Sequence, residues 1–182
     1  LYELDPADES AAAWFPAAGW PLLRSALARG VQAPVTSSMG RLFDAVAALL
    51  GLRTVSHYEG QAAMELEQAA EGATAAGYPF ALAGGVLDWA PAVRALRADA
   101  AAGRPVGEMA AAFHRGLAEA IVAVARAANV PRVALGGGCF QNARLLEESI
   151  AALRAAGFEP LWPREVPPND GGLAYGQLAA SV

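Results

Sequence analysis

Near the C-terminal end of this 182-residue chain, a strand, a glycine triplet, a helix and a second strand follow one another. The pattern predicts strands over 132–135 and 158–162, with a helix over 141–156 between them. Two strands joined by one helix normally pair in parallel with a right-handed crossover. Apolar residues at helical spacing fill much of the remainder, over 39–50, 61–71, 90–102 and 106–128. The order of elements therefore predicts a helix-rich α/β fold.

The glycine triplet is also the first candidate for a ligand site. Gly136, Gly137 and Gly138 have no side chain to keep a ligand from the backbone, and the N-terminus of the following helix favours phosphate. An ordinary strand–turn–helix corner without a ligand explains the same residues. Asn142, placed in the first turn of the predicted helix, either binds a nucleotide or caps its own helix.

Three carboxylates outside the strand–helix–strand segment each have two interpretations. Asp170, between an asparagine and two glycines, either caps the last helix, over 172–180, or holds a metal or a phosphate-bound cation. Asp44 either contacts a ribose or pairs with Arg41 three residues away, and the spacing alone favours the pair. Glu59 is either a polar substrate contact or an acid placed at a helix start.

Histidine and cysteine give weaker signals. His57 and His114 have no second ligand at metal-binding spacing, so a packing or solvated role is favoured for both. Cys139 follows the glycines at a predicted helix N-terminus, which would lower the pKa of its thiol. No base lies close to Cys139 in the sequence, and the residue is interpreted as a small packing residue.

Composition excludes several classes of function. All 13 basic residues are arginine, so a Schiff-base lysine or a phosphate-binding P-loop lysine is absent from these residues. A net charge of −5 without a basic stripe argues against nucleic-acid binding, and no apolar run is long enough to cross a bilayer. A single cysteine fits a reducing, cytoplasmic setting. The first methionine is Met39, which suggests a portion of a longer protein.

Several motifs together resemble one family. Taken in order, the segments that carry the resemblance are 36–45, 58–67, 113–114, 136–142 and 167–177. They look like the C-terminal part of the hydrogenase maturation carbamoyltransferases (HypF-type). The resemblance implies a helix-rich lobe of an actin-like, sugar-kinase-like (ASKHA-type) ATPase fold, shared with tRNA threonylcarbamoyl transferases and incomplete without an upstream lobe. Residues 31–182 would form the C-terminal nucleotide-binding lobe, and residues 1–30 an irregular lead-in with one brief helix at 21–30.

The resemblance also implies an activity. Members of the family use carbamoyl phosphate and ATP, with Mg, to make carbamoyl-adenylate. They pass the carbamoyl group to the C-terminal cysteine thiol of a partner maturation protein, which leads to the cyanide ligand of nickel–iron hydrogenase. An O-carbamoyltransferase that modifies a small hydroxylated metabolite and a non-catalytic lobe that binds the partner protein are the alternatives.

Carried over position by position, the family pattern assigns roles to particular residues. Asp44 and Gly60 match positions that hold the ribose, and Asp170 matches a ligand of an active-site iron or zinc ion. The nucleotide loop is matched by Gly136, Gly137, Gly138 and Asn142. Candidate substrate contacts are Ser38, Arg41 and Glu59. The paired histidines that complete the family's metal site are not in this sequence, so they are expected in upstream domains of the same polypeptide. The 182 residues alone are therefore expected to be inactive.

Overall fold

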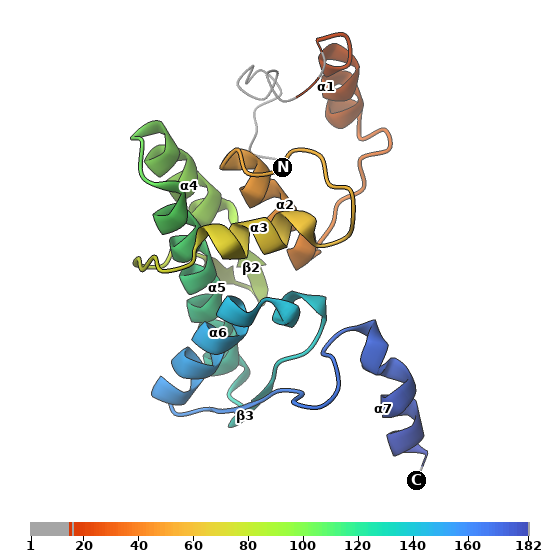
Figure 1. The fold of residues 1–182 in the computed structure, drawn as a ribbon, viewed down its shortest axis with the longest axis vertical. Coiled ribbons are helices and arrows are strands. Elements are labelled where there is room, and N and C mark those ends of the chain that lie inside the picture. Colours follow the sequence, from red (N-terminus) through yellow and green to blue (C-terminus); the bar gives the residue numbers. More distant parts are fainter. Residues whose placement is uncertain (1–14, 16, 182) are drawn as a thin grey trace.

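The computed structural model describes residues 15 and 17–181 and confirms a helix-rich α/β arrangement (Figure 1). Its N-terminal elements are α1 (Trp20–Arg29), α2 (Met39–Leu49), α3 (Gln61–Ala69), β1 (Ala81–Ala83), β2 (Val86–Asp88) and α4 (Ala90–Ala101). Then come α5 (Val106–Ala128), β3 (Arg132–Ala134), the short 3-10 helix η2 (Gly138–Gln141), α6 (Ala143–Ala155), β4 (Glu159–Leu161), the 3-10 helix η3 (Asp170–Gly172) and α7 (Leu173–Ala180).

Helix α5 is the centre of the molecule, and its N-terminal half packs against other helices. The ring of Phe113 on α5 meets the ring of Phe43 on α2 edge-on, and the two ring centroids are 5.1 Å apart. Leu66 of α3 and Leu96 of α4 are buried in the same core. Burial of such side chains contributes about 1.5–3 kcal/mol each, so this core holds α2, α3 and α4 on one rigid helix.

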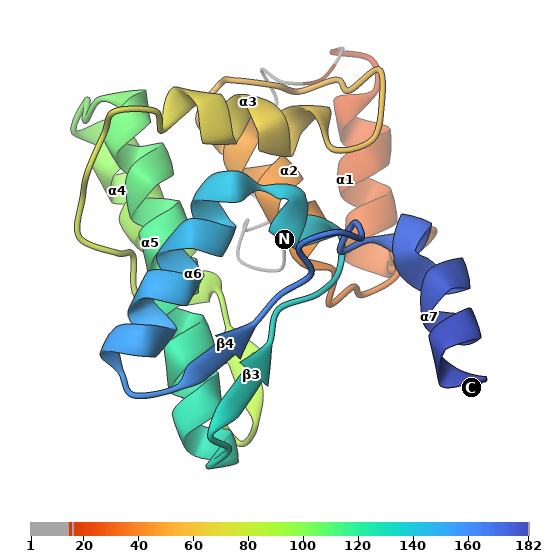
Figure 2. The same cartoon turned by 60° about the horizontal axis from the view of Figure 1, so that its bottom comes forward.

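The C-terminal half of α5 packs against the strand–helix–strand unit. Val122 and Ala125 of α5 share a second core with Leu135 and with Leu153 of α6. Strands β3 and β4 pair in parallel, with Val133 opposite Pro160, which confirms the predicted parallel pair joined by a helix. Figure 2 shows both strands beside α5 and α6.

The ends of the elements follow local signals with a few corrections. Ser38 caps α2 by accepting a hydrogen bond from the Arg41 backbone N–H. Gly84 and Gly85 form the turn that joins β1 and β2 in an antiparallel hairpin. The helix predicted over 141–156 begins at Ala143 instead, because η2 begins at the last glycine of the triplet and Asn142 has an extended backbone with ψ of 108°. The other predicted bounds shift by one or two residues.

The first and last helices lie at the margin of the fold. Helix α1 confirms the brief helix predicted at 21–30, whereas the lead-in residues 1–14 and 16 lie outside the described part. Neither α1 nor α7 has a buried residue, and Leu173, Tyr175 and Leu178 of α7 are exposed. Among the residues that the structure describes, no helix is long and apolar enough to cross a membrane.

Gly116 allows the chain before the hairpin to lie directly on α5. A Cβ atom at Gly116 would lie 2.3 Å from the Tyr78 carbonyl oxygen and 2.9 Å from its backbone nitrogen. The Tyr78 N–H donates to the Ala112 carbonyl oxygen at 3.0 Å, which fixes the segment at this short distance. The Tyr78 backbone therefore leaves no room for a side chain at Gly116.

We expect Gly116→Ala to lower the free energy of unfolding by about 1–3 kcal/mol or more, because the new methyl group would overlap backbone atoms. Gly176→Ala is the control, since its Cβ meets nothing within 4 Å and alanine favours a helix. Urea unfolding followed by circular dichroism measures both variants. Equal stability of the two would contradict the close contact.

Candidate functional site

The glycine triplet forms an exposed loop that leads from β3 into η2, whose first residue is Gly138. The ideal Cβ positions of Gly136, Gly137 and Gly138 all lie in open space, with no atom within 4 Å. Gly137 has φ of +94°, a conformation that side-chain-bearing residues rarely adopt. The backbone here is therefore open to a ligand.

One backbone hydrogen bond holds the segment before Asp170 against this loop. The Gly137 N–H donates to the Pro168 carbonyl oxygen at 2.6 Å. One residue further back, the Leu135 N–H donates to the Leu161 carbonyl oxygen at 2.7 Å, which continues the β3–β4 pair. The structure thus places the segment leading to Asp170 beside the glycine loop, as a shared site requires.

Asn142 is the N-cap of α6 and is nearly buried. Its Oδ1 accepts a hydrogen bond from the Leu145 N–H at 2.7 Å, and the Arg144 N–H donates to Glu67 Oε1 at 3.0 Å. Of the two alternatives for Asn142, the cap is observed. The prediction that the N–H groups of this helix are free to hold phosphate is wrong for Arg144 and Leu145, because side chains already occupy both groups. A phosphate near the loop would meet the glycine backbone instead.

His114 of α5 is fully buried directly behind Asn142. Its Nδ1 lies 2.8 Å from the Ala110 carbonyl oxygen, and its Nε2 lies 3.0 Å from Asn142 Nδ2. Burial, assisted by the nearby positive charge of Arg144, lowers the pKa of His114 to about 4, although the Ala110 hydrogen bond opposes the shift. The imidazole is therefore neutral at pH 7, in agreement with the favoured packing role.

Asp170 opens η3 with its side chain exposed. The cap at this turn is Asn169, whose Oδ1 accepts from the Gly171 N–H at 3.1 Å, so the interpretation of Asp170 as the cap is wrong. Within the described part of the chain, the Asp170 carboxylate makes no hydrogen bond or ion pair. No group of three or more potential metal ligands occurs among those residues either. The exposed Asp170 carboxylate can supply a single ligand to a metal ion, and it belongs to no such group among the described residues.

Helix α2 carries three of the predicted contacts. Asp44 forms the expected ion pair with Arg41, at 2.9 Å between Oδ2 and the guanidinium, and the Arg41 side chain is 68% exposed. A solvent-exposed pair of this kind contributes little to stability, so Asp44 remains accessible to a ligand. Helix α2, which carries Asp44 and follows Ser38, contacts both α3 and η2.

The turn before α3 carries the remaining candidates. Gly60 is the N-cap of α3 with φ of +79°, and Glu59 lies outside the helix with its side chain exposed. The His57 backbone N–H donates to Gln61 Oε1 at 2.8 Å, while the His57 side chain is exposed. Glu59 is therefore not a first-turn acid, and its position suits a contact outside this chain.

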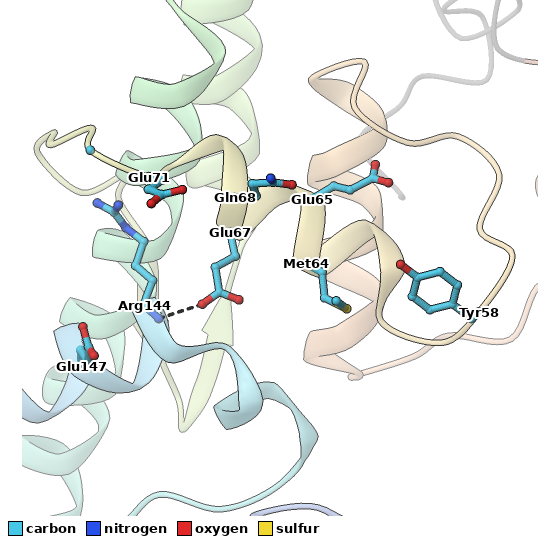
Figure 3. Close-up of a pocket in the computed structure, with 9 residues that line it drawn as sticks. Tyr58, Met64, Glu65, Glu67, Gln68, Glu71, Arg144 and Glu147 are labelled. Atoms are coloured by element: carbon cyan, nitrogen blue, oxygen red, sulfur yellow. Dashed lines mark hydrogen bonds between the residues drawn. The ribbon is translucent and has the colours of Figure 1, made fainter.

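A hollow of about 680 Å³ between α3 and α6 contains none of the predicted site residues (Figure 3). Its lining includes four glutamates, Glu65, Glu67, Glu71 and Glu147. Arg144 lines it too, but its guanidinium already donates to the Ala70 and Ala73 carbonyl oxygens. An excess of carboxylates repels phosphate, so this hollow is not a nucleotide site.

Cys139 lies in η2 and packs partly buried against the helical core. Burial raises the pKa of its thiol. The suggestion that a helix N-terminus lowers this pKa is wrong, because α6 begins four residues later. The packing interpretation agrees with these contacts.

Two features of this region were not predicted from the sequence: the hydrogen bond from Asn142 to His114, and the hydrogen bonds from Arg144 to α3 and the residues that follow it. Their only sequence signal is a polar residue within an apolar helical stripe, as at His114 beside Phe113. Such a residue must find a buried partner. Its partner is 28 positions away in the sequence and depends on how α5 and α6 pack.

Acid should destabilise this chain through His114. The folded state holds His114 near a pKa of 4, whereas an unfolded histidine titrates near 6.5, so between these values the unfolded state binds more protons and stability falls as the pH falls. From pH 7 to 4.5 we expect the wild type to lose about 2 kcal/mol more than His114→Gln. Urea unfolding at both pH values measures this difference. Lowered carboxylate pKa values, as at Asp99, act in both proteins and cancel; equal losses would contradict a buried neutral imidazole.

Comparison with known proteins identifies the family. Residues 2–177 match the family model described as "Carbamoyltransferase, Kae1-like Domain, second subdomain". The chain is 46% identical over 165 residues to carbamoyltransferase HypF of Synechocystis sp., covering 88% of this chain and 21% of that protein. It is 44% identical over 174 residues to HypF of Rhodobacter capsulatus, covering 92% of this chain and 22% of that protein. The chain thus spans about a fifth of the length of these relatives.

Two solved structures share the fold. A crystal structure of full-length HypF in its phosphate- and nucleotide-bound form matches with a TM-score of 0.84 and 31% identity, over 95% of this chain and 24% of that one. HypF of T. kodakarensis matches with a TM-score of 0.81 and 25% identity, over 99% of this chain and 24% of that one. The chain belongs to the HypF carbamoyltransferase family, where it corresponds to the second subdomain of the Kae1-like domain.

Proposed function

We propose that this chain is the nucleotide-binding lobe of a cytoplasmic carbamoyltransferase that acts in nickel–iron hydrogenase maturation. The observation that carries the proposal is the exposed glycine loop, which has open space at all three Cβ positions and is tied through Gly137 to the segment before Asp170. The similarity to a HypF structure in a phosphate- and nucleotide-bound form supports nucleotide binding by a protein of this family. On this proposal the lobe is one half of an actin-like, sugar-kinase-like fold that an upstream lobe completes.

The reaction proposed is carbamoyl transfer through an adenylate. Carbamoyl phosphate, ATP and water give carbamoyl-adenylate with release of phosphate and pyrophosphate, and the C-terminal cysteine of a partner maturation protein accepts the carbamoyl group. In the transfer, the thiol sulfur bonds to the carbonyl carbon while the bond from that carbon to the phosphate oxygen breaks. AMP leaves with its electron pair, and the thiol proton passes to solvent. The adenylate makes the step feasible because AMP is a good leaving group.

The residues of this lobe would bind and orient the nucleotide. The glycine backbone can approach phosphate oxygens closely, since no side chain intervenes. The Asp44 carboxylate can accept two hydrogen bonds from a ribose once its exposed pair with Arg41 opens. Gly60, at the start of α3, leaves room for the sugar beside α2. Ser38, Arg41 and Glu59 lie on the same helices or the turn between them and are candidates for substrate contacts.

A metal ion, iron or zinc, fits Asp170 only in part. Its carboxylate is exposed and unbonded within the described residues, as a ligand must be, but no cluster of ligands surrounds it. Upstream histidines would therefore have to complete the site. A metal bound there would act as a Lewis acid that polarises a carbonyl or phosphoryl oxygen. Because the site needs both parts, the 182 residues alone are expected to be inactive.

Gly136→Ala tests the nucleotide loop. Its φ lies outside the left-handed region and its Cβ meets nothing in the chain, so the substitution should not disturb the fold. A bound phosphate would meet the new methyl group. We expect ATP and ADP to bind at least about tenfold more weakly, which corresponds to about 1.4 kcal/mol. Isothermal titration of the complete polypeptide, with and without magnesium, measures this.

Gly176→Ala adds the same methyl group at an open position in α7 and serves as the control. Unchanged affinity in Gly136→Ala would refute the assignment of the loop. Asn142→Ala is a less specific probe, because the side chain also caps α6 and bonds His114. Removal of the Asn142 side chain should lower the free energy of unfolding by about 1 kcal/mol or more, whether or not a nucleotide binds.

Asp170→Asn tests the metal ligand. The amide keeps the shape of the side chain but removes the negative charge, so iron or zinc should be retained at a clearly lower level by the complete polypeptide. Metal content after dialysis, measured by plasma mass spectrometry, gives the result. Asp88→Asn, which changes a carboxylate in β2, is the control. Equal metal content in the wild type and Asp170→Asn would exclude Asp170 as a ligand.

A further inference from the structure

His114 is the one ionisable side chain that is completely buried within the described residues. It lies in the middle of α5, and its ring meets those of Phe43 and Phe113 edge-on at centroid distances of 5.5 and 6.0 Å. A buried polar ring among aromatic side chains is costly unless its nitrogen atoms are bonded. Both nitrogen atoms of His114 are bonded, and one of the bonds leads directly to the candidate site.

The hydrogen bonds around His114 have only one consistent direction. The Ala110 carbonyl oxygen can only accept, so Nδ1 carries the imidazole proton. In a neutral ring, Nε2 is then an acceptor and receives a hydrogen bond from Asn142 Nδ2. The Asn142 Oδ1 independently accepts from the Leu145 N–H. The bond from His114 to Ala110 and the bond from Leu145 to Asn142 require the same hydrogen-bond direction between the two side chains. The tautomer of His114 and the orientation of the Asn142 amide therefore determine each other.

This arrangement leaves part of the Asn142 amide unused. An amide nitrogen has two hydrogen atoms, and the bond to His114 takes one. Asn142 directly follows η2, which connects it to the glycine loop, and the side chain retains 8% exposure. A flipped amide would present its oxygen to His114 Nε2, which has no proton to donate, and would lose the cap on α6. The core therefore favours one orientation of the amide strongly.

We propose that His114 is a positioning residue, which fixes the Asn142 amide so that it caps α6 and keeps its second N–H for the nucleotide at the glycine loop. This inference rests on the proposed nucleotide site. His114 itself does not touch the nucleotide. Its effect passes through one hydrogen bond, which makes the strength of nucleotide binding depend on an acceptor inside the core.

Three variants of the complete polypeptide test the inference by isothermal titration with ADP. His114→Leu removes the acceptor and keeps an apolar side chain, and we expect ADP to bind about tenfold more weakly or worse. His114→Gln offers its Oε1 to Asn142 Nδ2 and should restore affinity to within about threefold of the wild type. Ser149→Ala is the matched control, because Ser149 is also fully buried and bonds only the Leu145 carbonyl oxygen on α6. It should lose stability and keep its affinity.

The outcomes separate this inference from the function proposed above. If the wild type and Ser149→Ala bind ADP and His114→Leu binds equally well, the inference fails and the nucleotide site stands. A failure of His114→Gln to restore binding, or an equal loss in Ser149→Ala, would leave a general structural effect and overturn positioning. If the wild type binds no nucleotide, the proposed function fails and the inference fails with it.

A spectroscopic measurement keeps the inference testable even if His114→Leu does not fold. In wild-type protein labelled with ¹⁵N-histidine, the His114 resonance, identified by its absence in His114→Gln, should show a protonated Nδ1 and an unprotonated Nε2. The opposite tautomer would mean that Nε2 cannot accept from Asn142 and would overturn the proposal.

Discussion

The close packing of small residues along α5 is the constraint on which the rest of the structure depends. Ala110, Ala111 and Ala112 are fully buried, and Gly116 lies against the backbone of Tyr78. Small side chains let neighbouring elements approach closely, so one helix supports both the helical core and the strand–helix–strand core. A larger residue at these positions would push the neighbouring elements away from α5.

The candidate site lies where these two cores meet. Phe140 of η2 packs against both of them, and Asn142 is bonded to α5 through His114. The ideal Cβ positions of the glycine loop contact nothing, but β3 before it and η2 and α6 after it are packed against the cores. An exposed loop held by a rigid frame suits a phosphate site, because little conformational entropy is lost when the ligand binds.

The two motifs of the site are joined by backbone, not by side chains. The parallel pairing of β3 with β4 sets the register, and the Gly137–Pro168 hydrogen bond extends it to the segment before Asp170. Asp170 and the apolar side chains of α7 are exposed. Such exposure is what we expect for groups that contact a ligand or another part of a protein. The chain spans about a fifth of the length of its HypF relatives, and the proposed function assigns the completion of this site to other parts of such a protein.

Local information in the sequence determined most of the elements and the family. Helical periodicity placed α2, α4 and α5 within a residue or two, and ordered motifs identified the relatives, because periodicity, caps and motif spacing are properties of neighbouring residues. Only the tertiary structure decided that Asn142 caps α6 and binds His114, that Asp170 does not cap its turn, and that the Arg144 N–H is already occupied by Glu67. Each of these depends on atoms from distant parts of the chain, or on backbone angles set by packing, and no local pattern encodes them.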